Sequence, residues 1–498
     1  MPHENRPHLT QTHITYPERG VYDSMKNEVY IRHILEPGFR FTRAHFLPCI
    51  LKINLAHVQM LINCRIIDEK DGSKLITELK NIMQNQSTFA DTYDPRFEDL
   101  FFMLENELEN RLGPETAGNL HVAFSRNDMD AAMYRMFWRD RLLEWVEALL
   151  HLRKQITLQA RQHITTIMPA YTHGQQAQPT TLAHYLLAVE AGLSRDCDRA
   201  LALYDRINES PMGAVALSTT GFKIDRDFMC RELGFARIMG NSYDAVSAAD
   251  YMVEIGGILT ISLATLSRFV HDLMGMASNE SGALRLDDRL VQISSVMPQK
   301  RNPSALEHTR AQISRSTAQL RGIPDFLRNV PLGDIVDIGD DIQPSLFDGF
   351  SHAVTSVELL AEVTAHADFN RKILYDRCKR SFSTSTEIAD TLVREHSLTF
   401  RIAHKIVSFF VKNIYDQGKT PADPGLAKEL EKAASKISGK DITINDEQYF
   451  RMTDPAAFIN SRTIPGGPAP AEADRQLQKA DLHMKQTAHS LDTLRGCH

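Results

Sequence analysis

The chain has 498 residues, of which 43% are hydrophobic and 24% are charged, and this balance is typical of a folded globular protein with a sizeable core. Its length predicts about three domains. The formal net charge of −7 argues against a protein that follows a nucleic-acid backbone, because such proteins concentrate lysine and arginine against the phosphates.

The cysteines and the apolar stretches exclude further classes of protein. The six cysteines are scattered without a C-x-x-C pair, so neither a zinc ribbon nor a disulfide framework is expected. Residues 1–20 lack the basic start and apolar run of a secretory signal. No stretch reaches the roughly 20 uninterrupted apolar residues of a membrane helix. We therefore expect a soluble protein of the reducing cytoplasm.

Helical patterns are short before about residue 120, and a very long helix is predicted next. From Asp128 to about Thr166 there is neither proline nor glycine, and Asp128 is the expected N-cap. Pro169 closes the segment. One face of this helix carries apolar residues at three- to four-residue steps, namely Met136, Leu143, Val146, Leu150 and Ile156.

Three further helices are predicted at about 179–208, 244–276 and 304–322. The polar loops that separate the helices are 172–178, 210–221 and 294–303. Helices of this length extend for about 45–50 Å at roughly 1.5 Å per residue, which is farther than one compact domain. We therefore expect subunits to bury them against each other in a homo-oligomer.

The predicted fold class is all-α, with three domains. A mainly helical domain over residues 1–123 precedes a central bundle of long helices over 124–370, and a small helical domain takes up 371–498. Proline and glycine crowd at 464–470, before a last polar helix from about Ala471.

The loop 294–303 carries a dense set of polar groups. Its two adjacent serines can accept or donate a proton, Lys300 supplies a positive charge for a carboxylate, and Asn302 offers an amide near the start of the next helix. Glu307 follows four residues beyond the loop. These groups suit an anionic ligand, and the alternative is a polar surface loop with a basic helix start.

Two other segments carry comparable groups. Residues 171–179, Tyr-Thr-His-Gly-Gln-Gln-Ala-Gln-Pro, place a hydroxyl, an imidazole and amides in one interhelical turn. Residues 121–128, His-Val-Ala-Phe-Ser-Arg-Asn-Asp, lead into the long helix, where Arg126 and Asn127 can grip a carboxylate. Taken alone, His173 can equally be a structural histidine, and Arg126 an ordinary surface residue of a capping segment.

Together, and in this order, the three segments resemble the active-site segments of the argininosuccinate lyase branch of the aspartase/fumarase superfamily. The matching motifs are Ser-Arg-Asn-Asp at 125–128, Tyr-Thr-His-x-Gln-x-Ala-Gln-Pro at 171–179 and Ser-Ser-x-Met-Pro-Gln-Lys-x-Asn-Pro at 294–303. The resemblance continues through 208–213, 224–226, 241–246, 400–404 and 466–467. Because it extends over nearly the whole chain, chance agreement at one loop does not explain it.

This resemblance implies a fumarate-releasing carbon–nitrogen lyase that needs no cofactor or metal, with each active site assembled from three subunits of a homotetramer. It implies that Ser294 removes the β-proton, that Lys300 stabilises the resulting dianion, and that His173, hydrogen-bonded to Glu307, manages the proton of the departing amine. The substrate-binding residues that it implies are Ser125, Arg126, Asn127, Thr172, Gln178, Ser295, Met297 and Asn302.

The chain departs from argininosuccinate lyases proper at several positions. Phe124 stands in place of an arginine, Phe101 in place of a histidine, and Ile293 in place of the glycine before the serine pair. These changes predict a less polar pocket. Within 331–348, the tyrosine, glutamine and lysine that hold the arginine portion in the family correspond to Ile335, Asp340 and Gln343.

Carboxylate-facing groups are thus kept while amine-side groups are exchanged, which favours the subgroup resembling ethylenediamine-disuccinate lyase, with aminopolycarboxylic acid substrates. Argininosuccinate lyase is the alternative. An acidic cluster either meets a cationic amine or is a solvated loop, and it comprises Asp334, Asp337, Asp340 and Asp341. A structural protein with the lyase fold, like lens crystallins of this family, or a binding protein for succinyl metabolites is a further alternative, against which Ser294, Lys300 and His173 argue.

Overall fold

The computed structural model describes residues 26–496. Residues 1–20, where no secretory signal is expected, and Cys497 lie outside that range. The chain forms two compact units. The first unit is Met1–Asp140, Asp205–Ala249 and Asn329–Pro344, and the second unit is Arg141–Tyr204, Asp250–Arg328 and Ser345–His498. The predicted division into three domains stays a prediction.

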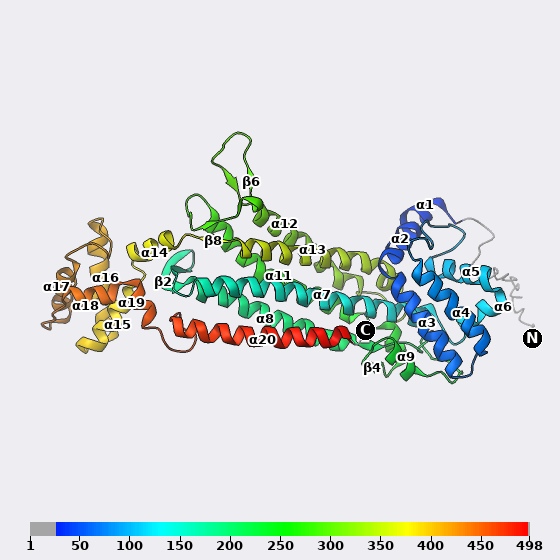
Figure 1. Cartoon of the computed structure of the whole chain (residues 1–498). Helices are drawn as coiled ribbons and strands as arrows, with labels where there is room; N and C mark the ends of the chain where they lie inside the picture. Colours follow the sequence, from blue (N-terminus) through cyan, green and yellow to red (C-terminus); the bar gives the residue numbers. More distant parts are fainter. Residues whose placement is uncertain (1–25, 497–498) are drawn as a thin grey trace, which may run out of the picture. The chain divides into compact units, whose positions relative to one another are not determined.

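Helices dominate the first unit, as the all-α prediction requires (Figure 1). Its elements are α1 (Glu28–Tyr30), η1 (Ile31–Leu35), α2 (Glu36–His45), α3 (Leu47–Asn63), α4 (Glu69–Gln84), α5 (Leu100–Leu112), α6 (Pro114–Ala117), η2 (Gly118–His121), β3 (Glu209–Ser210), α9 (Arg226–Glu232), β4 (Arg237–Ile238), α10 (Ser242–Ser247) and η4 (Asp337–Asp341). Strands β3 and β4 pair in parallel.

The second unit holds most of the long helices and a cluster of short ones near the C-terminus. Three helices contribute residues to both units, namely α7 (Arg126–Gln162), α8 (Leu182–Ile207) and α13 (Ile342–Ala365). The long helices of the second unit alone are α11 (Asp250–Ala277), α12 (Ser304–Phe326) and α20 (Pro470–Gly496). Its short helices are η3 (Asp288–Leu290), α14 (Arg371–Arg380), α15 (Ser385–His396), α16 (Phe400–Asp416), α17 (Leu426–Ser438), α18 (Asp446–Thr453) and α19 (Pro455–Asn460).

Strands in the second unit are short antiparallel pairs. They are β1 (Ile167–Thr172) with β2 (Gln175–Thr181), β5 (Leu284–Arg285) with β8 (Asp368–Phe369), and β6 (Gln292–Ile293) with β7 (Arg301–Asn302). The hairpin β1–β2 was not predicted, since residues 172–178 were expected to form a loop and a helix was expected from Pro179. That prediction is wrong: α8 begins at Leu182, and Pro169 pairs with Pro179 across the two strands.

The start of α7 also differs from the prediction. The Oγ of Ser125 accepts a hydrogen bond from the N–H of Asn127 at 3.2 Å, and the Oδ1 of Asp128 accepts one from the N–H of Ser125 at 3.3 Å. This reciprocal pattern is a capping box. The predicted N-cap Asp128 is therefore wrong, because Ser125 caps the helix. The Oδ2 of Asp128 instead accepts from the N–H groups of Gly213 and Val215, at 2.8 and 2.9 Å.

Helices α11 and α12 pack together in the second unit (Figure 1). A Cβ at Gly256 would lie 3.5 Å from the carbonyl oxygen of Leu320, so the missing side chain permits this close approach. By length and composition α11 could cross a membrane, and half of its most apolar window is buried within the described chain. A core helix of a helical bundle has the same composition.

Both tryptophans of the chain lie in α7 and are fully buried. In the first unit, the Nε1 of Trp138 donates to the Oε1 of Gln343 at 2.8 Å. In the second unit, Trp145 is buried, and farther along the helix Arg153 of α7 forms a buried ion pair with Glu190 of α8, in which Nη2 and Oε1 are 2.7 Å apart. The free-energy cost of removing these two charges from water is offset by their direct contact.

The imidazole of His57 in α3 makes the stability of the fold dependent on pH. Its side chain is 2% exposed, and its Nε2 donates to the carbonyl oxygen of Val122 at 3.0 Å. Burial lowers the pKa of His57 from 6.5 to about 4, although the hydrogen bond to Val122 opposes this change. The folded chain therefore keeps the ring of His57 neutral. In the unfolded chain the same ring binds a proton once the pH falls below its ordinary pKa of 6.5.

We expect His57 to contribute stability above about pH 6.5 that is lost as the pH falls toward 4. The loss is about 2 kcal/mol between pH 6.5 and 5, since one pKa unit corresponds to about 1.4 kcal/mol. Comparing urea midpoints of the wild type and His57→Gln at pH 7 and pH 5 tests this expectation. The variant should lose less stability on acidification, and an equal loss in both proteins would contradict the assignment.

Candidate active site

The hydroxyl of Ser294 lies at the start of the loop between β6 and β7 and faces two backbone donors. Its Oγ accepts hydrogen bonds from the N–H of Val296 at 3.2 Å and from the N–H of Met297 at 3.0 Å. The N–H of Lys300 donates to the carbonyl oxygen of Met297 at 3.0 Å and closes the turn. The structure thus places two backbone donors at the Ser294 oxygen, and the predicted role of Ser294 as the base stays a prediction.

The other predicted residues of this segment are open to solvent within one chain. Ser295, Met297 and Lys300 are exposed, as is the preceding Ile293. Two further members lie beyond the residues that connect β6 to β7. Asn302 belongs to β7 and is half-buried, while Glu307 is exposed in the first turn of α12.

The hairpin β1–β2 presents Thr172 and His173 at its tip, and both are exposed. His173 and Gly174 form the two-residue turn with φ values of 54° and 72°. Two positive φ values in a two-residue hairpin are those of a type I′ turn, which Gly174 adopts without strain. Gln178 on β2 donates from Nε2 to the Oγ1 of Thr386 at 3.0 Å.

In the first unit, the start of α7 holds Ser125, Arg126 and Asn127, all half-buried. The Oγ of Ser125 donates to the Oδ1 of Asn127 at 3.0 Å. The guanidinium of Arg126 forms an ion pair with Asp99 and lies over the ring of Phe102, 4.9 Å from its centroid. Arg126 therefore already has an anionic partner in the protein.

Several carboxyl groups act electrostatically on Arg126 and on one another. Desolvation raises the pKa of Asp130 well above its ordinary value, and the charges of Asp99, Asp340 and Asp334 add to this effect. Desolvation likewise raises the pKa of Asp340 to about 6, with contributions from Asp99 and Asp334 that Arg126 only partly offsets. Burial and mutual repulsion therefore favour the protonated forms of Asp130 and Asp340, because one guanidinium does not offset the neighbouring carboxylates.

The aromatic residues that depart from the family pattern pack against each other. The rings of Phe101 and Phe124 are stacked with centroids 6.1 Å apart, and both side chains are buried. The ring of His57 lies 4.8 Å from Phe124. The two exchanged residues thus form one apolar cluster near the start of α7, and the predicted less polar pocket stays a prediction.

The structure of one chain does not bring the predicted catalytic groups of the second unit together. Among the hydrogen bonds and ion pairs of residues 26–496, none joins His173 to Ser294, Lys300 or Glu307. The predicted contact between His173 and Glu307 therefore stays a prediction, and so do the roles of the site residues. In the same range, no group of three histidine, cysteine or carboxylate side chains is arranged to hold a metal ion.

Sequence reasoning missed the partners that fix these residues in place. Asp99 and Asp130, whose charges act together with that of Arg126, belong to none of the three motifs. Asp130 follows Arg126 at helical spacing, and this spacing is a sequence signal that could have pointed to it. Thr386, the partner of Gln178, lies far away in the sequence and offers no comparable signal.

Comparisons with known proteins agree with this architecture. Residues 74–316 match a lyase family model, and residues 382–460 match the model of the argininosuccinate lyase C-terminal region. Argininosuccinate lyase 2 of Agrobacterium fabrum is 34% identical over 455 residues, which cover 91% of this chain and 90% of that protein.

Two solved structures are similar over most of their length. EDDS lyase in complex with formate has a TM-score of 0.83 and 28% identity, covering 91% of this chain and 89% of that one. A doubly substituted EDDS lyase variant with bound fumarate has a TM-score of 0.83 and 27% identity, covering 95% and 93%. The chain therefore belongs to the argininosuccinate lyase branch of the aspartase/fumarase superfamily and is a fumarate-forming carbon–nitrogen lyase.

Proposed function

We propose that this lyase releases fumarate from an N-substituted aspartate of the aminopolycarboxylic acid class, and that the departing amine is not arginine. Gln343 carries the proposal. It corresponds to the lysine that holds the arginine portion in argininosuccinate lyases, but here it is 1% exposed and its Oε1 accepts from Trp138. A side chain so committed to the core does not reach a substrate.

The carboxyl groups around Arg126 support an amine with positive charge. Asp334 and Asp340 were predicted either to meet a cationic amine or to belong to a solvated loop. Their charges act on Asp130, and the pKa of Asp340 lies near 6 because desolvation and neighbouring carboxylates raise it. Above that pH the cluster gains negative charge, which favours a protonated diamine or amino acid.

The chemistry proposed at Ser294 is a stepwise elimination. The Ser294 oxygen takes the β-proton of the substrate, and the electron pair of the broken C–H bond passes to the neighbouring carboxylate. Lys300 and Asn302 stabilise that charge. The C–N bond then breaks as the double bond of fumarate forms, and the departing amine receives a proton from His173 or from a water molecule that it orients.

We further propose a homotetramer in which three subunits contribute to each site. Thr172, His173 and Lys300 are exposed in the single chain, although elimination needs a site that excludes water. The apolar helix α11 is only half buried. A cavity of about 1300 Å³ beside β1–β2, lined by His184, Arg268 and others, offers room for a neighbouring chain.

Argininosuccinate lyase activity is the second candidate, because the curated relative from Agrobacterium fabrum bears that name at 34% identity. The reverse reaction decides between the two. We expect the protein, incubated with fumarate and single amines, to form adducts with ethylenediamine or amino acids, identified by mass spectrometry. If arginine is the one amine that reacts, the proposed substrate class is wrong.

Asp340→Asn provides a matched variant for this panel. In the addition direction it should raise the KM of a cationic amine while leaving the KM of fumarate near the wild-type value, because Asp340 is proposed to meet the ammonium group. Unchanged amine KM values would place the acidic cluster outside the amine site.

A further inference from the structure

Strand β2, the second strand of the hairpin that carries His173, has two polar ties to the rest of the second unit. The Nε2 of Gln178 donates to the Oγ1 of Thr386 at 3.0 Å. Two residues farther along, the Oγ1 of Thr180 lies 2.8 Å from the Nδ1 of His184 in the first turn of α8. Each of these two contacts connects β2 to a segment that is itself held by further contacts.

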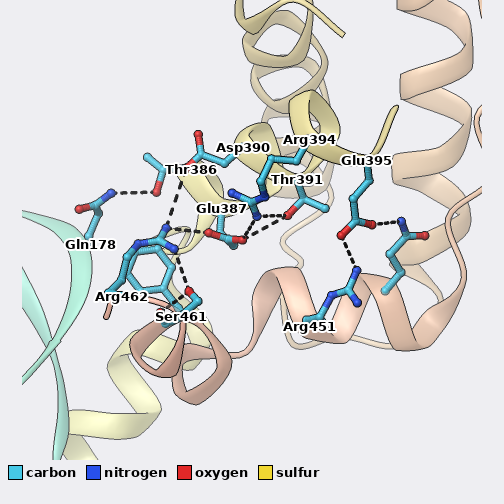
Figure 2. Close-up of polar contacts among 12 residues, drawn as sticks. Gln178, Thr386, Glu387, Asp390, Thr391, Arg394, Glu395, Arg451, Ser461 and Arg462 are labelled. Atoms are coloured by element: carbon cyan, nitrogen blue, oxygen red, sulfur yellow. Dashed lines mark hydrogen bonds and ion pairs between the residues drawn. The ribbon is translucent and has the colours of Figure 1, made fainter. Parts of the chain in front are cut away.

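The first tie leads to Glu387, the residue after Thr386 in the first turn of α15. Glu387 is 6% exposed and forms an ion pair with Arg394 and another with Arg462, whose Nη2 lies 2.7 Å from its Oε2 (Figure 2). Burial alone would raise the pKa of Glu387, but hydrogen bonds from Arg462 and Arg394 outweigh it and lower the pKa. The carboxylate is therefore ionised at neutral pH, and charge-assisted bonds of this kind are strong.

The second tie leads back to the same arginine. The Nε2 of His184 donates to the carbonyl oxygen of Gly466 at 3.0 Å. Gly466 lies in the tight loop that begins at Arg462, and a Cβ on Gly467 would lie 2.3 Å from the carbonyl oxygen of Arg462. The guanidinium of Arg462 also lies over the ring of Phe458, 4.0 Å from its centroid.

The contacts form a closed ring. It runs from Gln178 through Thr386 and Glu387 to Arg462, and returns through Gly466 and His184 to Thr180. We propose that Glu387 and Arg462 are positioning residues for the elimination. Their ion pair connects the two ties of β2 and so holds in place the β1–β2 hairpin that presents Thr172 and His173. This inference rests on the role proposed for His173.

The same helix offers a matched control. Glu395 of α15 also pairs with an arginine, Arg451, with Nη2 and Oε1 2.6 Å apart, and Figure 2 shows this pair separate from the ring. We expect Glu387→Gln to lower kcat by about tenfold or more, since a small displacement of a reacting group is costly. Glu395→Gln should stay within about twofold of the wild type, because exposed ion pairs contribute little.

Thr386 separates positioning from folding, because its side chain is exposed. Thr386→Val keeps the shape of the residue and removes the acceptor of Gln178, whereas Thr386→Ser keeps the hydroxyl. We expect the valine variant to lower kcat more than it changes KM, and the serine variant to restore kcat. If Glu387→Gln and Thr386→Val both turn over at the wild-type rate, the proposal is overturned.

Hydrogen exchange without substrate tests the positioning independently of the reaction. Amides of residues 167–181 should exchange faster in Glu387→Gln and Thr386→Val than in the wild type, and at the wild-type rate in Glu395→Gln. Unchanged exchange in the first two variants overturns the proposal even in an active enzyme. If the wild type forms no fumarate adduct with any amine, the proposed function is wrong. The exchange result then still decides whether the ring of contacts holds the hairpin in place.

Discussion

Replacement of Ser294 by alanine should abolish turnover without disturbing the fold. The hydroxyl oxygen is the proposed base, and the N–H groups of Val296 and Met297 are the donors that favour its ionised form. A positioned general base contributes about 10²- to 10⁴-fold to a rate, so we expect kcat to fall at least that far. The formation of fumarate from a substrate found in the amine panel measures this loss.

The neighbouring serine is the control for this variant. Ser295→Ala removes an identical hydroxyl one residue away and should mainly raise KM, because Ser295 is predicted to bind a carboxylate. Thermal midpoints and sedimentation of both variants should match the wild type. An active Ser294→Ala enzyme would exclude Ser294 as the base.

Mixed assembly of two inactive variants should recover activity. Ser294→Ala disables the serine loop and His173→Asn disables the hairpin. If a site takes these two segments from different chains, it is intact when the hairpin comes from a Ser294→Ala chain and the loop comes from a His173→Asn chain. Random mixing of the subunits of a symmetric oligomer makes about a quarter of the sites complete. Activity measured after the two proteins are unfolded, mixed and refolded together tests this expectation.

A second pair gives the contrast. Ser294 and Lys300 lie on one loop of the same chain, so Ser294→Ala mixed with Lys300→Ala can never yield an intact segment. This mixture should stay inactive. Sites formed within single chains would make both mixtures inactive, and the proposal of shared sites would then fail.

The long helices could be predicted because their signals are local, and the motifs of the candidate site are local as well, although the roles of their residues stay predictions. The run without proline or glycine from Asp128 to about Thr166 predicts α7, and the motifs at 125–128, 171–179 and 294–303 together indicate the lyase branch before any coordinates are known. The N-cap was placed wrongly because Ser125 and Asp128 both favour that position, and only their reciprocal hydrogen bonds decide between them.

The remaining features depend on contacts between distant residues. The hairpin β1–β2 was hidden because Pro169 and Pro179 are also typical of helix boundaries, and because a His-Gly turn is a weaker hairpin signal than Asn-Gly. The pairing of Glu387 with Arg462 follows from tertiary packing, to which no spacing in the sequence corresponds. The carboxyl groups around Arg126 likewise come from separate segments.

The confinement of both tryptophans to α7 gives the protein a selective optical signal. Trp138 and Trp145 are fully buried, and the chain has no other indole. Intrinsic fluorescence excited at the indole band therefore reports one helix and is silent about the hairpin, the serine loop and the C-terminal helices. A red shift of the emission would mark water reaching α7. The signal therefore distinguishes unfolding around α7 from a local rearrangement at the three predicted active-site segments.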